Sequence, residues 1–222
     1  MLALFAFGAA AAPTPDSPPD ELIAGFVPHA LQRAWGAPKF DVGSWVEYRI
    51  GARRNKADSY RLRLSVVPPA LAGDRRWLEV KIIGTGGGLT MRLLTKGEPD
   101  RPGNIERLLV QDAGQAPLEL PMMDLRREGD DAPAPEAPAK VTRAPGGKLT
   151  VPAGTFETTK LSAAHGAAAW YSKDAPIYGL VRAESSEQLV ELVASGRTGA
   201  FAEIPVDDPQ APPPDAGMRL AP

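Results

Sequence analysis

Four consecutive segments of the sequence alternate apolar and polar side chains with a period of two. In residues 46–50 the apolar side chains are Val46, Tyr48 and Ile50, and the same alternation runs through 60–66, 78–82 and 89–93. Successive side chains of a β-strand point to opposite faces of a sheet, so each segment would carry one apolar and one polar face. Glycine- and proline-containing stretches separate the segments and are typical of turns. The pattern predicts an antiparallel meander with one apolar face.

Other parts of the chain extend this meander. Further strand-like segments are predicted at 105–111, 149–151, 155–161, 168–172, 178–184 and 188–194, and segment 117–125 is either a loop or an edge strand. Before the first strand, residues 20–36 carry apolar side chains at three- and four-residue spacing, which indicates an amphipathic helix that Pro28 would kink or divide and Gly36 would end. We therefore predict an α+β fold that is mostly β: a curved antiparallel sheet or half-open barrel of eight to ten strands with an N-terminal helix.

Proline is concentrated in a few places. The chain of 222 residues contains 24 prolines, and these cluster at 13–19, 133–145 and 205–222. Proline has no backbone N–H and a fixed φ, so such clusters are unfavourable inside a helix or a sheet. We predict a single β-rich domain over 20–204, interrupted by a Pro/Ala-rich linker at 126–147 and followed by a disordered tail at 205–222.

The first twelve residues, MLALFAFGAAAA, form an apolar segment of their own. They resemble the hydrophobic region of a secretory signal, although no Lys or Arg precedes it, and the run is too short for a membrane span. We expect an exported, periplasmic protein. The alternative is a cytoplasmic protein with an apolar terminus.

Composition excludes several kinds of chemistry. Without cysteine the chain has no disulfide, no cysteine nucleophile and no Cys-based metal site. The two histidines, His29 and His165, are 136 residues apart, and no nucleophile-elbow or phosphate-loop motif is present. The glycine-rich stretch 84–88 joins two predicted strands and is interpreted as a hairpin loop. We expect no catalytic residue, no metal and no cofactor; a hydrolase dependent on either histidine is the third and least favoured alternative.

The polar face of the predicted meander is basic. Residues 49–110 contain 13 Lys or Arg and 6 Asp or Glu, whereas the whole chain has a net charge of −2. Alternation places five cations on that face: Arg49, Arg61, Arg63, Lys81 and Arg92. This face is either a solvated surface or a platform for an anionic partner such as lipid head groups. Few aromatic residues interleave with these cations, so we expect no nucleic-acid partner.

Aromatic residues also fall near the polar face. Trp45 and Trp77 lie at, or next to, the alternate positions whose side chains point to the polar face of the sheet. Their ordinary role is packing at the core or rim of the sheet, and ligand stacking is the alternative.

Two segments carry a resemblance to a known family. LTVPAGTFETTKL (149–161) and WYSKDAPIYGLVRAES (170–185) resemble the C-terminal half of an uncharacterised exported bacterial family with V-P-A-G-T-F, W-Y-S and G-L-V-R motifs. That family is similar in architecture to outer-membrane lipoprotein-carrier-like half-barrels, which implies a half-open barrel around an apolar cavity. The motifs have structural roles here: Gly154 suits a tight turn and Pro176 a strand entry. Unlike lipid-anchored members, the chain has no lipobox cysteine.

These observations favour binding over catalysis. We expect a non-catalytic cell-envelope protein that binds a hydrophobic or lipid-like ligand, such as an acyl chain, on the concave face of its sheet. The residues expected to line that site are Val46, Tyr48, Leu62, Leu64, Val80, Met91 and Leu93. The alternative is an interaction or assembly module that contacts other envelope proteins through its basic face.

Overall fold

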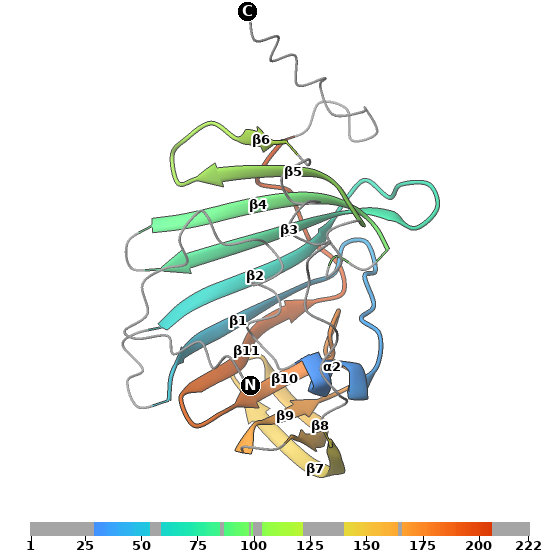
Figure 1. Ribbon diagram of the computed structural model, residues 1–222, viewed down its shortest axis with the longest axis vertical. Helices are drawn as coiled ribbons and strands as arrows, with labels where there is room; N and C mark the ends of the chain where they lie inside the picture. The colour runs from blue at the N-terminus through green and yellow to red at the C-terminus, as the bar shows by residue number, and fades with distance from the viewer. Residues whose placement is uncertain are drawn as a thin grey trace, which may run out of the picture.

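The computed structural model describes residues 29–53, 59–84, 87–97, 99, 104–121, 140–163 and 166–205. Within them one antiparallel sheet of eleven strands dominates the fold (Figure 1). The strands are β1 Trp45–Ala52, β2 Ser59–Val67, β3 Arg75–Gly84, β4 Gly87–Lys96, β5 Ile105–Asp112, β6 Leu118–Leu120, β7 Thr142–Val151, β8 Gly154–Ser162, β9 Ala168–Tyr171, β10 Leu180–Glu184 and β11 Gln188–Gly196. The prediction of a mostly β, antiparallel fold is confirmed.

The sheet consists of two meanders joined by one long-range pairing. Its strand order is β6-β5-β4-β3-β2-β1-β11-β10-β9-β8-β7, so β1 and β11 link the two halves and β6 and β7 are the edges. The link runs from Trp45↔Gly196 to Ala52↔Gln188. The sheet is open, and it exceeds the predicted eight to ten strands because the three-residue β6 forms at the edge, in the segment predicted as either loop or edge strand.

One short helix lies within the described residues. Helix α2, His29–Trp35, follows Pro28 directly and ends at the predicted Gly36, whose N–H donates to the Gln32 carbonyl at 3.0 Å. It contacts β8 and β9 (Figure 1). The helical part of the fold is therefore small, and the predicted segment before residue 29 lies outside the described residues.

Strand β7 corrects the prediction for the linker 126–147. The strand begins at Thr142, so residues 142–147 belong to the sheet, while 122–139 lie outside the described residues. Pro145 is accommodated because β7 is an edge strand and because the register shifts between Pro145 and Gly147. Proline is tolerated at edges and bulges, where no ladder N–H is needed. In the predicted tail, Pro205 is described and 206–222 are not.

The V-P-A-G turn between β7 and β8 bends the second meander. Gly154 has φ +135°, as expected for a glycine in a tight turn, and the Ala153 N–H donates to the Leu192 carbonyl of β11 at 3.3 Å. Ala153 and Val151 also pack on the same apolar face as Leu192. The sheet therefore curls toward that face at its β7 end, and we call it the concave face.

Apolar side chains form two clusters, one on each face of the sheet. The concave cluster takes members from β1–β5 and β7–β11, together with Leu31 of α2 and with Ala175 and Ile177. The smaller outer cluster lies on the opposite face and consists of Val67, Trp77, Leu94, Leu109, Ala200 and Ile204, with Trp45 and Leu71 packed against it. Segment 200–204 is irregular and forms part of the cover of the outer face.

Candidate functional site

The seven residues predicted to line a ligand site all lie in the concave cluster. They are Val46, Tyr48, Leu62, Leu64, Val80, Met91 and Leu93. Strand register brings four of them into one row across β1–β4, Val46↔Leu64↔Val80↔Met91. Tyr48 is opposite Leu62 in the next row. The side chains that the alternation predicts on the apolar face therefore form one continuous surface.

This surface is enclosed. The seven side chains are at most 4% exposed. The described helix over the concave face, α2, contacts β8 and β9, which lie on the other side of β1 from β2–β4. A ligand on this face would therefore be held in the interior of the protein and not on an open surface.

Three tyrosines and a tryptophan belong to the concave cluster or pack against it: Tyr48, Tyr171, Tyr178 and Trp35. The rings of Trp35 and Tyr171 are stacked, with centroids 5.1 Å apart and planes 14° apart. Tyr178 contacts Phe40 edge-on at 5.9 Å. The Tyr48 hydroxyl donates to the Leu180 carbonyl at 3.2 Å. Burial raises the pKa of both Tyr48 and Tyr171 well above the ordinary value for tyrosine, so both hydroxyls stay protonated at neutral pH.

The sequence contained a signal for this group that was not interpreted as a site. Tyr171 and Tyr178 belong to the W-Y-S…P-x-x-G-L-V-R motif, to which only structural roles were assigned. Their meeting with Trp35 and Tyr48 depends on the pairing of β1 with β11, which brings β10 and β9 close to β1 and which local alternation does not reveal.

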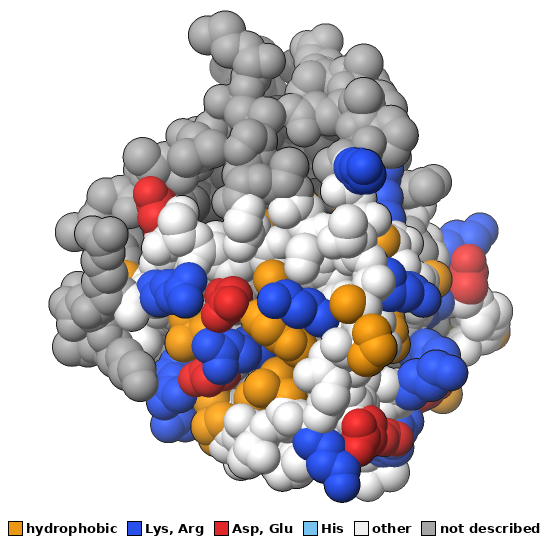
Figure 2. Space-filling model, turned by 90° about the horizontal axis from the view of Figure 1, so that it is seen from below, with side chains coloured by type: hydrophobic (Ala, Val, Ile, Leu, Met, Phe, Trp, Pro, Cys, Tyr) orange, Lys and Arg blue, Asp and Glu red, His pale blue; other side chains and the backbone are white. Residues whose placement is uncertain are grey.

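Most cations of the predicted basic face are paired. Arg49 contacts Glu191 at 2.7 Å, Arg61 contacts Glu47 at 3.2 Å and Lys81 contacts Glu203 at 2.6 Å. Seen from below, basic side chains are interspersed with acidic and hydrophobic ones (Figure 2). The excess of Lys and Arg counted over 49–110 is therefore balanced locally by glutamates, two of them from after residue 190.

The two remaining cations contact aromatic rings. Arg63 lies 4.3 Å from the ring centroid of Trp45 and 5.2 Å from that of Phe201. Arg92 is only 3% exposed and lies 4.8 Å from the centroid of Trp77. The expectation that Arg92 belongs to an exposed basic face is wrong, because residues 200–204 cover that part of the sheet. The expected packing role of Trp45 and Trp77 is confirmed.

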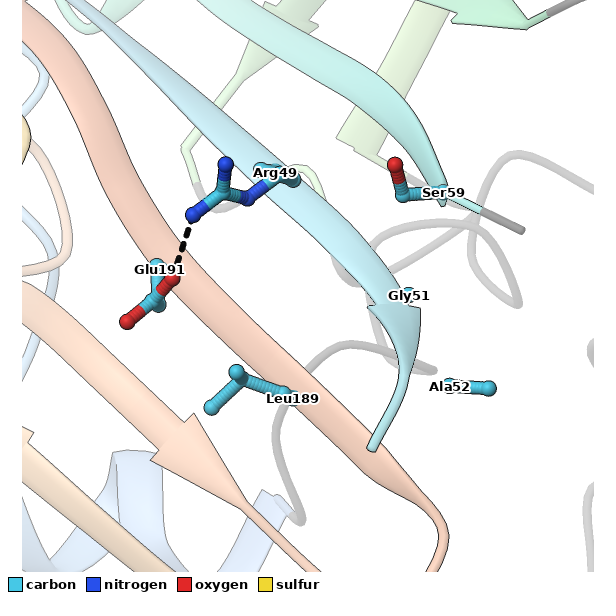
Figure 3. A pocket seen from close by; sticks show the side chains of 6 residues that line it. All are labelled: Arg49, Gly51, Ala52, Ser59, Leu189 and Glu191. Carbon is cyan, nitrogen blue, oxygen red and sulfur yellow. Dashed lines mark hydrogen bonds and ion pairs between the residues drawn. The ribbon is translucent and has the colours of Figure 1, made fainter. Parts of the chain in front are cut away.

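A shallow hollow lies on the outer face where β1, β2 and β11 meet. Its empty volume is about 270 Å³, including space open to solvent, and it is lined by Arg49, Gly51, Ala52, Ser59, Leu189 and Glu191 (Figure 3). The Arg49–Glu191 ion pair spans one side of it. The lining pairs no nucleophile with a histidine base, and its cation is already matched by a carboxylate.

Histidines and acidic residues are the side chains on which a catalytic or metal site would depend. His29 begins α2, and His165 lies outside the described residues. Among the described residues, no group of three or more His, Cys, Asp or Glu could hold a metal ion. No described helix is long and apolar enough to cross a membrane.

Comparisons with known proteins give distant structural likenesses. No family model and no curated protein matches the chain. A structure described as "a putative lipoprotein" from Parabacteroides distasonis is 10% identical, with 72% of this chain and 99% of that chain covered and a TM-score of 0.33. One described as "a putative exported protein with YmcC-like fold" from Bacteroides fragilis is 12% identical, with 72% and 98% covered and a TM-score of 0.32. At these values the likenesses establish neither a shared fold nor a function.

Proposed function

We propose that this chain is a non-catalytic protein of the cell envelope that holds a hydrophobic or lipid-like ligand, such as an acyl chain, against its concave face. The observation that supports the proposal is the continuity of the enclosed apolar surface, which receives side chains from β1–β5 and β7–β11 of an open sheet. The envelope location rests on the signal-like segment 1–12.

The shape of the sheet explains why this surface suits a ligand. A sheet with one apolar face buries that face against another layer, either a second sheet or helices. Here α2, a helix of seven residues, contacts the sheet at β8 and β9, whereas the row Val46–Leu64–Val80–Met91 lies on β1–β4. Because the side chains of that row are already at most 4% exposed, an acyl chain held against them would gain mainly by burying its own apolar surface, at about 25 cal/mol per Å².

The test is whether purified protein carries and rebinds a lipid. Native mass spectrometry and solvent extraction of the full chain would identify a bound amphiphile, and delipidated protein would then be titrated with hexadecanoic acid. Substitution Val80→Phe adds volume at the centre of the concave row and should weaken binding about tenfold. Leu109→Phe adds volume in the outer cluster and is the matched control.

Two outcomes contradict the proposal. The first is that no lipid is extracted and delipidated wild type binds none of the titrated acid. The second is that Val80→Phe and Leu109→Phe weaken binding equally, because the effect would then follow from general loss of stability and not from the concave face.

The alternative, an assembly module that uses the basic face, draws less support from the geometry. Arg61 and Arg63 are satisfied by Glu47 and by the rings of Trp45 and Phe201. A pull-down that compares wild type with Arg61→Glu/Arg63→Glu tests it. Loss of envelope partners in the variant, with lipid binding unchanged, would favour the alternative over the ligand-binding proposal.

A further inference from the structure

The loop 172–179, between β9 and β10, has a backbone that its sequence alone would not favour. Ile177 has φ +58°, a left-handed conformation that is a genuine outlier for a β-branched residue. Such conformations cost about 1–3 kcal/mol, persist only where surrounding contacts require them, and are concentrated at functional sites. Here the Ile177 carbonyl accepts the Lys39 N–H at 2.8 Å, which fastens the loop to the segment after α2.

The loop 172–179 packs closely against the Trp35 side chain. Gly179 has φ +70°, and a Cβ at this position would lie 2.6 Å from Trp35 Nε1 and 3.0 Å from the Ser172 carbonyl oxygen. The Gly179 carbonyl in turn accepts the Ser172 N–H at 2.8 Å. The glycine therefore allows Trp35 to approach the backbone, and Trp35 is stacked on Tyr171.

The Tyr171 ring is held by stacking on Trp35, but its hydroxyl lacks a hydrogen-bond partner. Tyr171 is 0% exposed, and its hydroxyl has no hydrogen-bond partner among the described residues. An unsatisfied buried polar group costs about 1–3 kcal/mol. Tyr48, in the same concave cluster, shows the contrast, because its hydroxyl donates to the Leu180 carbonyl at 3.2 Å. At neutral pH the Tyr171 hydroxyl is protonated, so it is a donor for which the described residues provide no acceptor.

We propose that the Tyr171 hydroxyl donates a hydrogen bond to an oxygen of the bound ligand, and that this ligand is a fatty acyl compound with a carbonyl group, not a hydrocarbon. This inference rests on the proposed function and specifies the polar end of its ligand. The stacked Trp35 holds the Tyr171 ring in place, and the apolar side chains of the concave cluster would receive the chain.

The surroundings of Tyr171 define the acceptor further. A carbonyl brings an acceptor without a donor of its own, so it leaves no new unsatisfied N–H or O–H in the interior. A carboxylate would bring a charge into an apolar site, which is costly without a paired cation. The acyl carbonyl of an ester or of a protonated fatty acid therefore matches the site.

The experiment compares three probes of equal chain length on delipidated full-length protein. Hexadecanoic acid, methyl hexadecanoate and hexadecane are delivered from cyclodextrin, and their dissociation constants are measured for wild type, Tyr171→Phe and Tyr60→Phe. We expect wild type to bind methyl hexadecanoate, and hexadecanoic acid at a pH low enough to keep the acid protonated, about five- to tenfold more tightly than hexadecane. Tyr171→Phe should lose this preference and keep its affinity for hexadecane.

Tyr60→Phe is the matched control. It also removes a tyrosine hydroxyl, from a half-buried side chain that packs against the concave cluster but is not among the seven lining residues, so it should leave the preference among probes unchanged. Infrared spectra of bound [1-¹³C] methyl hexadecanoate give a second measurement. The carbonyl band should move to higher wavenumber in Tyr171→Phe and stay in place in Tyr60→Phe, which a purely structural effect would not produce.

The outcomes separate this inference from the proposed function. If wild type binds none of the three probes, both are overturned. If it binds all three equally, or if its preference survives in Tyr171→Phe, the hydrogen bond is overturned and the proposed function stands. A Tyr171-dependent preference for only one carbonyl probe supports the inference and identifies the ligand as an acid or as an ester.

Discussion

Glu79 and Arg92 are directly opposed on β3 and β4 and together hold one short stretch of backbone from the end of the domain. The Glu79 carboxylate accepts the N–H groups of Glu203 at 3.0 Å and of Ile204 at 3.2 Å. The Arg92 guanidinium donates to the Ile204 carbonyl. A donor and an acceptor from neighbouring strands thus fix residues 197–205, which we call the C-terminal strap, against the outer face of the sheet.

Removal of the acceptor should loosen the strap. Substitution Glu79→Ala leaves two backbone N–H groups and the buried Arg92 without their carboxylate, so we expect the free energy of unfolding to fall by about 2–4 kcal/mol. Urea denaturation monitored by circular dichroism measures it. Glu157→Ala is the matched control: its carboxylate is exposed and 3.9 Å from Lys148, and the change should stay within about 0.5 kcal/mol. Equal losses in both variants would show that the strap contacts do not contribute.

The stabilising effect of Glu79 should depend on pH. Burial is the largest influence on its carboxyl group and raises its pKa above the ordinary value, against the lowering effects of the two backbone N–H groups and Arg92. A carboxyl with a raised folded-state pKa contributes most to stability when protonated, and this contribution is lost as pH rises through that pKa. The difference in unfolding free energy between wild type and Glu79→Ala should therefore shrink as the pH rises above the ordinary pKa of a glutamate, about 4.3. A difference that grows with pH would contradict the pKa direction.

The alternation of side chains predicted the sheet well because it is a local property. Tyr48 and Leu62, chosen from the pattern alone, are paired across β1 and β2 on the apolar face. The same pattern placed Arg92 on the outer face correctly but could not show that the face is covered there. Its cover, Ile204, is 112 residues away in the chain and carries no periodicity that would mark it.

Two other features could not be predicted from local sequence patterns for the same reason. The proline at position 145 indicated a linker, whereas an edge strand with a register shift accommodates it. The enclosure of Tyr171 depends on Trp35, which comes from a helix far earlier in the chain. Local sequence signals give strands and their faces, but the ends of a sheet and the segments that fold over it are fixed by long-range contacts.

Gly179 should be indispensable for the stacked pair Trp35–Tyr171. In Gly179→Ala the new Cβ would meet Trp35 Nε1 and the Ser172 carbonyl, and φ +70° is unfavourable for alanine. We expect a loss of about 2–4 kcal/mol in unfolding free energy, together with a weaker near-ultraviolet circular dichroism signal.

The matched control for that substitution is Gly84→Ala, at the end of β3. A Cβ there meets nothing within 4 Å, so stability should change by less than about 0.5 kcal/mol, or rise slightly. An unchanged near-ultraviolet signal in Gly179→Ala would mean that Trp35 and Tyr171 are not held by this loop.

The strap should open when its apolar anchor is made polar. Ile204 is 0% exposed in the outer cluster, so Ile204→Asp would place a carboxylate among Trp77, Leu94 and Leu109. The strap is expected to detach while the concave cluster stays intact. Since Arg197 is exposed at the start of the strap, trypsin should then cleave after it at least about tenfold faster than in wild type.

The control for this substitution is Phe201→Asp. The Phe201 side chain is 57% exposed, so this variant changes the same segment without touching the anchor and should leave the cleavage rate within about twofold. Mass spectrometry of the fragment that begins at Thr198 gives the rate. Equal rates in both variants would show that Ile204 does not fasten the strap.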